Sequence, residues 1–163
     1  MKIVPVVFIS ILTLAAVGYG YLNLSSDAVL HADINKKVMS ALDRDQSATP
    51  IKFLSTLEAH TLFRTQKALF LDARLERDFQ YLHIPGARSV FYQDAKKSLF
   101  LKKLKRDQLI VVYCASAQCP MAELLANALH ELQFKRVYVY SGGMKEWMAA
   151  KYPTQRFQFP DQL

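Results

Sequence analysis

The sequence predicts one α/β domain built on a small parallel sheet, because three short apolar runs have the character of buried strands. These runs are Ala68–Leu71, Leu109–Tyr113 and Arg136–Tyr140. Short, nearly continuous apolar runs are typical of parallel strands that are covered on both faces. Between the last two runs, residues 120–132 carry apolar side chains at helical spacing. A strand, a helix and a strand in this order predict a right-handed crossover within a parallel sheet.

Two further helices are expected in the first half of this domain. Ser55 and Glu58 have the spacing of a capping box, which predicts that a helix starts after Ser55. Residues 94–107 combine six cationic side chains with interspersed apolar ones, which predicts one amphipathic basic helix. Its cationic face is expected either to be solvated or to contact a membrane surface.

The N-terminal segment has a different character from the rest of the chain. No charged side chain occurs between Lys2 and Asp27. As a helix, residues 3–22 would measure about 30 Å, the thickness of the hydrocarbon core of a bilayer. Residues 1–24 are therefore expected to be a signal anchor or a cleaved signal peptide, and both fit. The domain is then expected on the exported, periplasmic or other extracytoplasmic side, anchored in the membrane by residues 3–24 if these are not cleaved.

Composition and charge limit the remaining possibilities. The chain is 52% hydrophobic and 21% charged, which excludes a disordered tail and a multi-span membrane protein. Residues 25–49 are expected to form a polar tether, residues 50–153 the domain, and residues 154–163 a C-terminal tail. The net charge of +7 suggests an anionic partner. Nucleic acid is not expected as that partner, because no nucleic-acid motif is present.

The loop after the second predicted strand is the most informative candidate site. Ligands of parallel sheets bind beyond the carboxyl ends of the strands. Cys114 stands at such an end, and Pro120 opens the helix that follows the loop. The backbone N–H groups of the loop and the helix dipole would then converge on the Cys114 sulfur, lower its pKa and hold an anion. The pattern predicts either a nucleophilic thiolate or a small buried side chain at a strand end.

Two groups of residues in this domain resemble the rhodanese-like sulfurtransferases, in order and in spacing. The first group comprises Leu71–Arg74, Phe79 and His83–Ala87. The second comprises Tyr113–Cys114 with its loop, Val137–Tyr140, Gly142–Gly143 and Trp147. The resemblance covers roughly residues 50–152, and it implies a rhodanese-like three-layer α/β/α fold with a small central parallel sheet.

The resemblance also implies a chemistry. Cys114 would be the catalytic residue that accepts sulfane sulfur from a small sulfur-containing donor and passes it, as a persulfide, to a thiol or another nucleophile. Asp72 and Arg74 would support the loop and the sheet edge as an ion pair. No cofactor and no metal are expected, because the histidines have no metal-ligand spacing with each other or with the cysteines. The persulfide charge would be stabilised by the backbone N–H groups of Ala115, Ser116, Ala117, Gln118 and Cys119.

Three departures from the family pattern bear on the substrate. This chain has Ala117 and Cys119 where the family commonly has Gly and Arg, and Leu82 where it usually has Gly. Without the loop Arg, a fixed cation for an anionic donor such as thiosulfate is missing. The short loop and the missing Arg also argue against phosphate-ester hydrolysis, since phosphatase relatives have a longer loop that ends in Arg.

The second cysteine leaves alternative functions open. Cys119 could act as a resolving thiol that attacks a persulfide on Cys114 and leaves a disulfide. The domain could instead be an exported thiol–disulfide or redox module that uses Cys114 and Cys119. Cys119 could also serve only to cap the helix. A third class of function is a catalytically idle rhodanese-like module that binds a partner through its surface.

Overall fold

The computed structural model describes residues 32–42 and 51–157. The chain divides into two units, residues 1–45 and 46–163. In the first unit, residues 32–42 form a helix within the segment predicted to be a tether. The predicted anchor or signal peptide, residues 1–24, lies outside the described residues and stays a prediction. Within the described part of the chain, no helix is both long enough and apolar enough to cross a bilayer.

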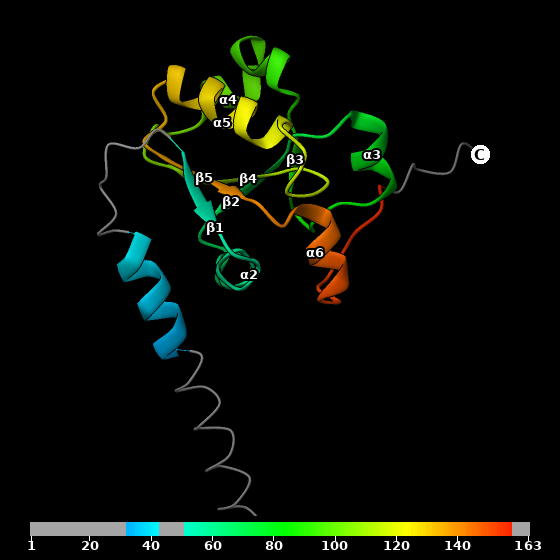
Figure 1. Cartoon of the computed structure of the whole chain (residues 1–163). Helices are drawn as coiled ribbons and strands as arrows, with labels where there is room; N and C mark the ends of the chain where they lie inside the picture. Colours follow the sequence, from blue (N-terminus) through cyan, green and yellow to red (C-terminus); the bar gives the residue numbers. More distant parts are fainter. Residues whose placement is uncertain (1–31, 43–50, 158–163) are drawn as a thin grey trace, which may run out of the picture. The chain divides into compact units, whose positions relative to one another are not determined.

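The second unit is built on a sheet of five parallel strands, which confirms the predicted fold class (Figure 1). The strand order is β1-β5-β4-β2-β3. The three predicted strands form the centre of this sheet, and the short strands β1 and β3 form its edges. The bounds are β1 Lys52–Leu54, β2 Leu69–Asp72, β3 Arg88–Ser89, β4 Leu109–Tyr113 and β5 Arg136–Tyr140.

Helices cover both faces of the sheet. Figure 1 shows α4 and α5 on one face and α2 and α6 on the other, as a three-layer fold requires. The predicted capping box at the start of α2 is confirmed, because the Ser55 hydroxyl accepts from the Glu58 N–H and the Glu58 carboxylate accepts from the Ser55 N–H at 2.8 Å. The bounds are α2 Thr56–Thr65, α3 Glu76–Tyr81, the 3₁₀-helix η1 Tyr92–Lys97, α4 Leu99–Lys103, α5 Met121–Glu131 and α6 Gly143–Ala149.

Alternate side chains of the central strands form two separate cores. On the face that α5 covers, apolar strand residues pack with Leu125 and Leu129, and Cys114 belongs to this cluster. On the other face, the fully buried Trp147 lies edge-on to Phe63 and Phe70, with ring centroids 5.4 and 6.3 Å apart. Burial of each such side chain stabilises the fold by about 1.5–3 kcal/mol. The two cores explain why the central strands are apolar without interruption.

The basic segment differs from the single helix predicted for residues 94–107. It consists of η1 and α4, which meet at Ser98. The Ser98 hydroxyl accepts a hydrogen bond from the Leu101 N–H at 3.3 Å, so Ser98 caps the start of a new helix. Leu101 is fully buried, whereas Leu99 is 71% exposed. Because the helix restarts at Ser98, the apolar and cationic residues do not lie on two faces of one continuous helix.

Residues beyond the predicted domain boundary pair with the domain. His83 and Gln155 exchange two backbone hydrogen bonds of 2.8 Å in an antiparallel bridge, although Gln155 lies in the predicted C-terminal tail. The Trp147 indole N–H donates to the Pro153 carbonyl at 2.7 Å, just before this bridge. The buried His83 also makes a 2.7 Å hydrogen bond from its Nδ1 to the Phe79 carbonyl. His83 therefore serves packing and hydrogen bonding, with both the α3 segment and the end of the domain.

Candidate active site

Three candidate segments come together at one edge of the sheet. Strands β2, β4 and β5 are neighbours, and their pairing places Asp72, Tyr113 and Tyr140 side by side. The chain continues from Tyr113 into the Cys114 loop and from Tyr140 into the segment that begins α6. The ion-pair residue Asp72, the cysteine loop and the glycine pair 142–143 therefore share the carboxyl edge of the sheet, where parallel folds bind ligands.

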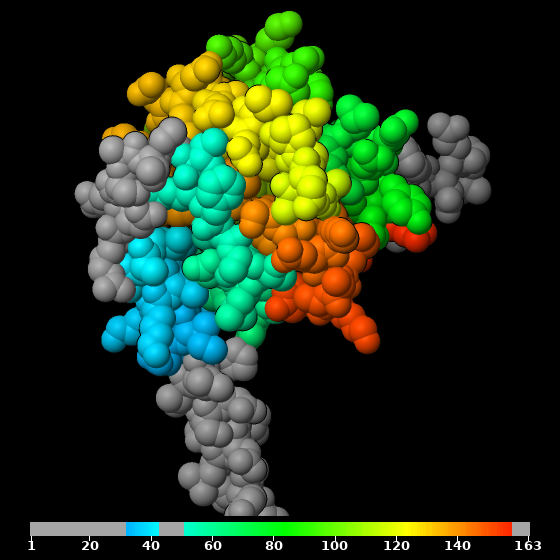
Figure 2. All heavy atoms as spheres, viewed as in Figure 1, coloured from blue at the N-terminus to red at the C-terminus, as the bar shows by residue number. Residues whose placement is uncertain are grey.

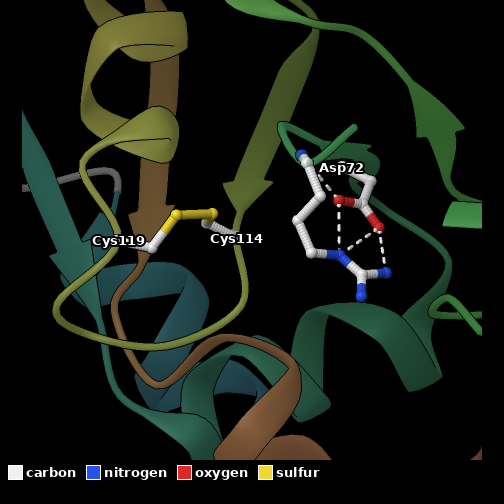
Figure 3. Close-up of a disulfide and its surroundings, with 4 residues drawn as sticks. Asp72, Cys114 and Cys119 are labelled. Carbon is white, nitrogen blue, oxygen red and sulfur yellow. Dashed lines mark hydrogen bonds and ion pairs between the residues drawn. A yellow bond between two sulfur atoms is a disulfide. The ribbon is translucent and has the colours of Figure 1, made fainter. Parts of the chain in front are cut away.

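The two cysteines of the loop are joined by a disulfide. Figure 3 shows the bond between Cys114 and Cys119, whose Cα atoms are 6.1 Å apart. Cys114 is only 2% exposed, whereas Cys119 is partly exposed. The structure thus shows the oxidised form of the site, and the Cys114 sulfur becomes a nucleophile only after reduction.

Main-chain hydrogen bonds from α6 hold the first half of the loop. The Met144 N–H donates to the Cys114 carbonyl and the Lys145 N–H donates to the Ala115 carbonyl, both at 2.9 Å. In a trans peptide the N–H points opposite to the C=O. The N–H groups that follow these two carbonyls, those of Ala115 and Ser116, therefore point away from α6.

Several backbone N–H groups of the loop have no hydrogen-bond acceptor in the described part of the domain. The Cys119 N–H donates to the Ser116 carbonyl at 3.0 Å and closes a turn before α5. Within residues 51–157, the N–H groups of Ala115, Ser116, Ala117 and Gln118 donate to no protein atom. Adjacent free N–H groups of this kind bind anions. The loop surfaces beside the segment that follows β5, where the yellow and orange atoms meet in Figure 2.

Gly143 permits the close contact between α6 and the loop. Its φ is +58°, and a Cβ built there would lie 2.6 Å from the Cys114 carbonyl oxygen and 2.8 Å from the Ser116 nitrogen. Both atoms belong to the main chain, so neither can move aside without moving the loop. The sequence pattern points to the glycine pair, but the atoms that Gly143 contacts come from a distant segment. Sequence reasoning therefore missed the roles of Gly143, Met144 and Lys145.

We expect Gly143→Ala to destabilise the domain by about 2–4 kcal/mol, because it combines left-handed backbone strain with overlap against the loop. Urea unfolding measures the loss. Gly86→Ala is the matched control, since Gly86 has φ +77° but a Cβ added there would meet nothing within 4 Å. The control should lose only the backbone strain of about 1–2 kcal/mol. Equal losses in the two variants would contradict the proposed contact.

Asp72 and Arg74 form a buried, bidentate ion pair. The Arg74 guanidinium donates to both Asp72 carboxylate oxygens, at 3.0 and 2.6 Å, and also to the Leu82 carbonyl at 2.6 Å. The Asp72 side chain is fully buried and that of Arg74 is 12% exposed. In Figure 3 the dashed lines from the Asp72 carboxylate run to the arginine side chain drawn beside it, and none runs to the disulfide. The pair thus lies at the end of the strand next to the cysteine loop, and among the described residues its hydrogen bonds go to partners other than the two cysteines.

The pKa values of this pair's surroundings fit a structural role. Burial opposes the charge of Arg74, but hydrogen bonds to Asp72 and its negative charge outweigh burial and raise the pKa of the guanidinium. Burial, together with the Asp72 charge, raises the pKa of the Tyr113 hydroxyl well above its ordinary value. That hydroxyl accepts a hydrogen bond from the Ile84 N–H at 3.2 Å. Arg74 therefore stays charged and Tyr113 stays neutral at physiological pH.

Comparison with known families assigns the fold and the site segments together. The family model of the rhodanese-like domain matches residues 55–150, which include Asp72, the cysteine loop and Gly143. The chain belongs to the rhodanese-like domain family. The family assignment predicted from the sequence motifs is thus confirmed.

Curated relatives of this rhodanese-like domain include a named enzyme. The chain is 30% identical over 108 residues to the uncharacterized protein YibN of Escherichia coli, covering 65% of this chain and 73% of that protein. It is 29% identical over 103 residues to the thiosulfate sulfurtransferase GlpE of Coxiella burnetii, covering 63% of this chain and 92% of the enzyme. Sulfur transfer is thus supported at the level of the family.

Solved structures agree with the rhodanese-like fold. The BH2092 protein of Bacillus halodurans superposes with a TM-score of 0.58 at 20% identity, over 65% of this chain and 77% of that chain. A rhodanese-related protein of Thermoplasma volcanium gives a TM-score of 0.55 at 19% identity, over 66% of this chain and 99% of that chain. At these identities the likeness concerns the fold alone.

Proposed function

We propose that this rhodanese-like domain is a sulfurtransferase that carries sulfane sulfur as a persulfide on Cys114. The observation that carries the proposal is the position of Cys114. It stands at the carboxyl end of β4, and the loop that follows it offers four backbone N–H groups that have no acceptor among residues 51–157. Such a loop suits a sulfur atom that gains negative charge during the reaction. The similarity to a thiosulfate sulfurtransferase supports the same chemistry.

The reaction would proceed in two displacements. The reduced Cys114 thiolate attacks the outer sulfur of a donor such as thiosulfate, a sulfur–sulfur bond forms, and sulfite leaves with the electron pair of the broken bond. An acceptor thiolate then attacks the terminal sulfur of the persulfide and takes it, which regenerates the Cys114 thiolate. The loop N–H groups would stabilise the persulfide, and the Asp72–Arg74 pair would hold the neighbouring strand end in place.

The test is uptake of sulfur by the reduced protein. The protein is reduced, freed of reductant and incubated with thiosulfate, and its intact mass is then measured. Release of one sulfite per chain is the expected result, and the transferred sulfur either stays on the chain as added mass or leaves it as hydrosulfide. Failure to release sulfite from thiosulfate, together with failure to take up sulfur from an organic persulfide, would contradict the proposal.

The Cys114–Cys119 disulfide favours a second candidate, a thiol–disulfide module. Such a module would exchange its disulfide with dithiols and would take up no sulfur. The release of sulfite from thiosulfate, measured together with the intact mass, separates the two functions. A thiol–disulfide module would only gain and lose two hydrogen atoms as it cycles with a dithiol such as dithiothreitol.

A further inference from the structure

We propose that Cys119 is a resolving thiol, which displaces the sulfur that Cys114 carries and releases it as hydrosulfide. The inference rests on the proposed function, because it needs a persulfide on Cys114. The supporting observation is the disulfide, because the bond shows that the Cys119 sulfur can reach the Cys114 sulfur itself. In the persulfide, the Cys114 sulfur is the inner of the two sulfur atoms. Attack at this atom expels the outer sulfur, whereas attack at the outer atom would only move it to Cys119.

The proposed step balances as a thiol–disulfide exchange. The Cys119 thiolate attacks the Cys114 Sγ, the bond between the two Sγ atoms forms, and the bond to the outer sulfur breaks. The outer sulfur leaves with the electron pair of the broken bond and takes up a proton. The Cys119 thiol has released one proton, so the number of protons is unchanged. The outer sulfur is reduced to hydrosulfide while the Cys119 sulfur is oxidised. A dithiol reductant then opens the disulfide and restores both thiols.

The exposure of the two cysteines favours an internal attack. Cys114 is 2% exposed, so its sulfur is poorly accessible to an external acceptor. Cys119 belongs to the same loop and is already within bonding reach, which gives it the advantage of an intramolecular reactant. Cys119 is also the more exposed of the pair. A reductant can therefore reach the Cys119 sulfur when the disulfide has to be opened.

The local structure also suits Cys119 as a nucleophile. It precedes Pro120, the N-cap of α5. The positive end of the helix dipole favours a thiolate at this place. The hydrogen bond from the Cys119 N–H to the Ser116 carbonyl, 3.0 Å long, folds the loop back and keeps Cys119 near Cys114. The loop position at which the family commonly has Arg thus holds a second sulfur nucleophile in this chain.

A single-turnover experiment tests the inference. The reduced full chain is freed of reductant and mixed with thiosulfate, without oxygen and without an acceptor thiol. We expect the wild type to release one hydrosulfide per chain and to end with the mass of the disulfide form. Cys119→Ser and Cys119→Ala should instead keep the added sulfur and release at least about tenfold less hydrosulfide in the same time. Asn127→Ala, on the exposed side of α5, is the control and should behave as the wild type.

The outcomes separate this inference from the proposed function. If the wild type keeps the added sulfur as long as Cys119→Ser does, Cys119 is not a resolving thiol, while sulfur uptake by Cys114 stands. Equal release of hydrosulfide from the wild type and from both Cys119 variants would also overturn the inference. If neither the wild type nor either Cys119 variant takes up sulfur, the proposed function is wrong and the inference falls with it.

Discussion

Replacing Cys114 by Ser should abolish sulfur uptake completely. The serine hydroxyl stays protonated at neutral pH and forms no persulfide, so the variant has no atom at this position that can accept sulfane sulfur. The intact mass after incubation with thiosulfate should equal that of the untreated protein. No sulfite should appear. Because Cys114 is buried at a strand end, thermal unfolding should confirm that the variant is folded before its activity is compared.

The remaining cysteine makes this variant a strict test. Cys114→Ser retains Cys119, so any sulfur that it takes up would identify Cys119 as the acceptor and contradict the assignment to Cys114. Cys119→Ser is the matched control, with the same change at the other end of the disulfide. If neither the wild type nor the variants take up sulfur, and Cys114→Ser keeps full cellular function, the domain is a binding module rather than an enzyme.

Replacing Asp72 by Asn should cost about 3–5 kcal/mol of unfolding free energy, because it leaves the Arg74 guanidinium buried without its counter-charge. The Asp72 side chain is fully buried and both of its oxygens accept from Arg74. Asparagine has nearly the same shape but offers one acceptor oxygen and no charge. Urea unfolding at neutral pH measures the loss. Sulfur uptake per folded molecule should persist, since the hydrogen bonds of the Arg74 guanidinium go to Asp72 and to the Leu82 carbonyl.

Asp78→Asn is the control for this prediction. Asp78 forms a 3.5 Å ion pair with Arg77, but the two side chains are 46% and 81% exposed. Exposed pairs contribute little, so the control should lose less than about 1 kcal/mol. If the two variants lost the same amount, the buried pair would not hold the sheet edge. Loss of sulfur uptake by folded Asp72→Asn would instead place Asp72 in the chemistry.

The central strands and the family were predictable because their signals are local. Strands β2, β4 and β5 are covered on both faces, so their burial appears as uninterrupted apolar runs. The edge strands β1 and β3 have three and two residues, which is too short for any period to appear. The division of the basic segment depends on one hydrogen bond of the Ser98 side chain. A hydroxyl at that position does not by itself distinguish a helix start from a solvated side chain.

The sequence predicts which residues make up the candidate site but not the contacts between them. Cys114 and its loop follow from their position between a strand and a helix. The close approach of Gly143 to Cys114 joins residues far apart in the sequence, so no spacing rule predicts it. The disulfide was left open for a similar reason. Five positions separate the two cysteines, and whether such a loop can bring the sulfur atoms together depends on its folded path.

The hydrogen bonds between α6 and the loop join main-chain atoms, so they form whatever side chains the loop carries at its exposed positions. Met144 and Lys145 donate to the loop through their main-chain N–H groups. Ala115, Ala117 and Gln118 are exposed. Mutations at these three positions would alter charge and bulk around the reactive sulfur while leaving its scaffold intact. Under the proposed function, substitutions at these three positions would change the preference for a sulfur donor without a change of fold.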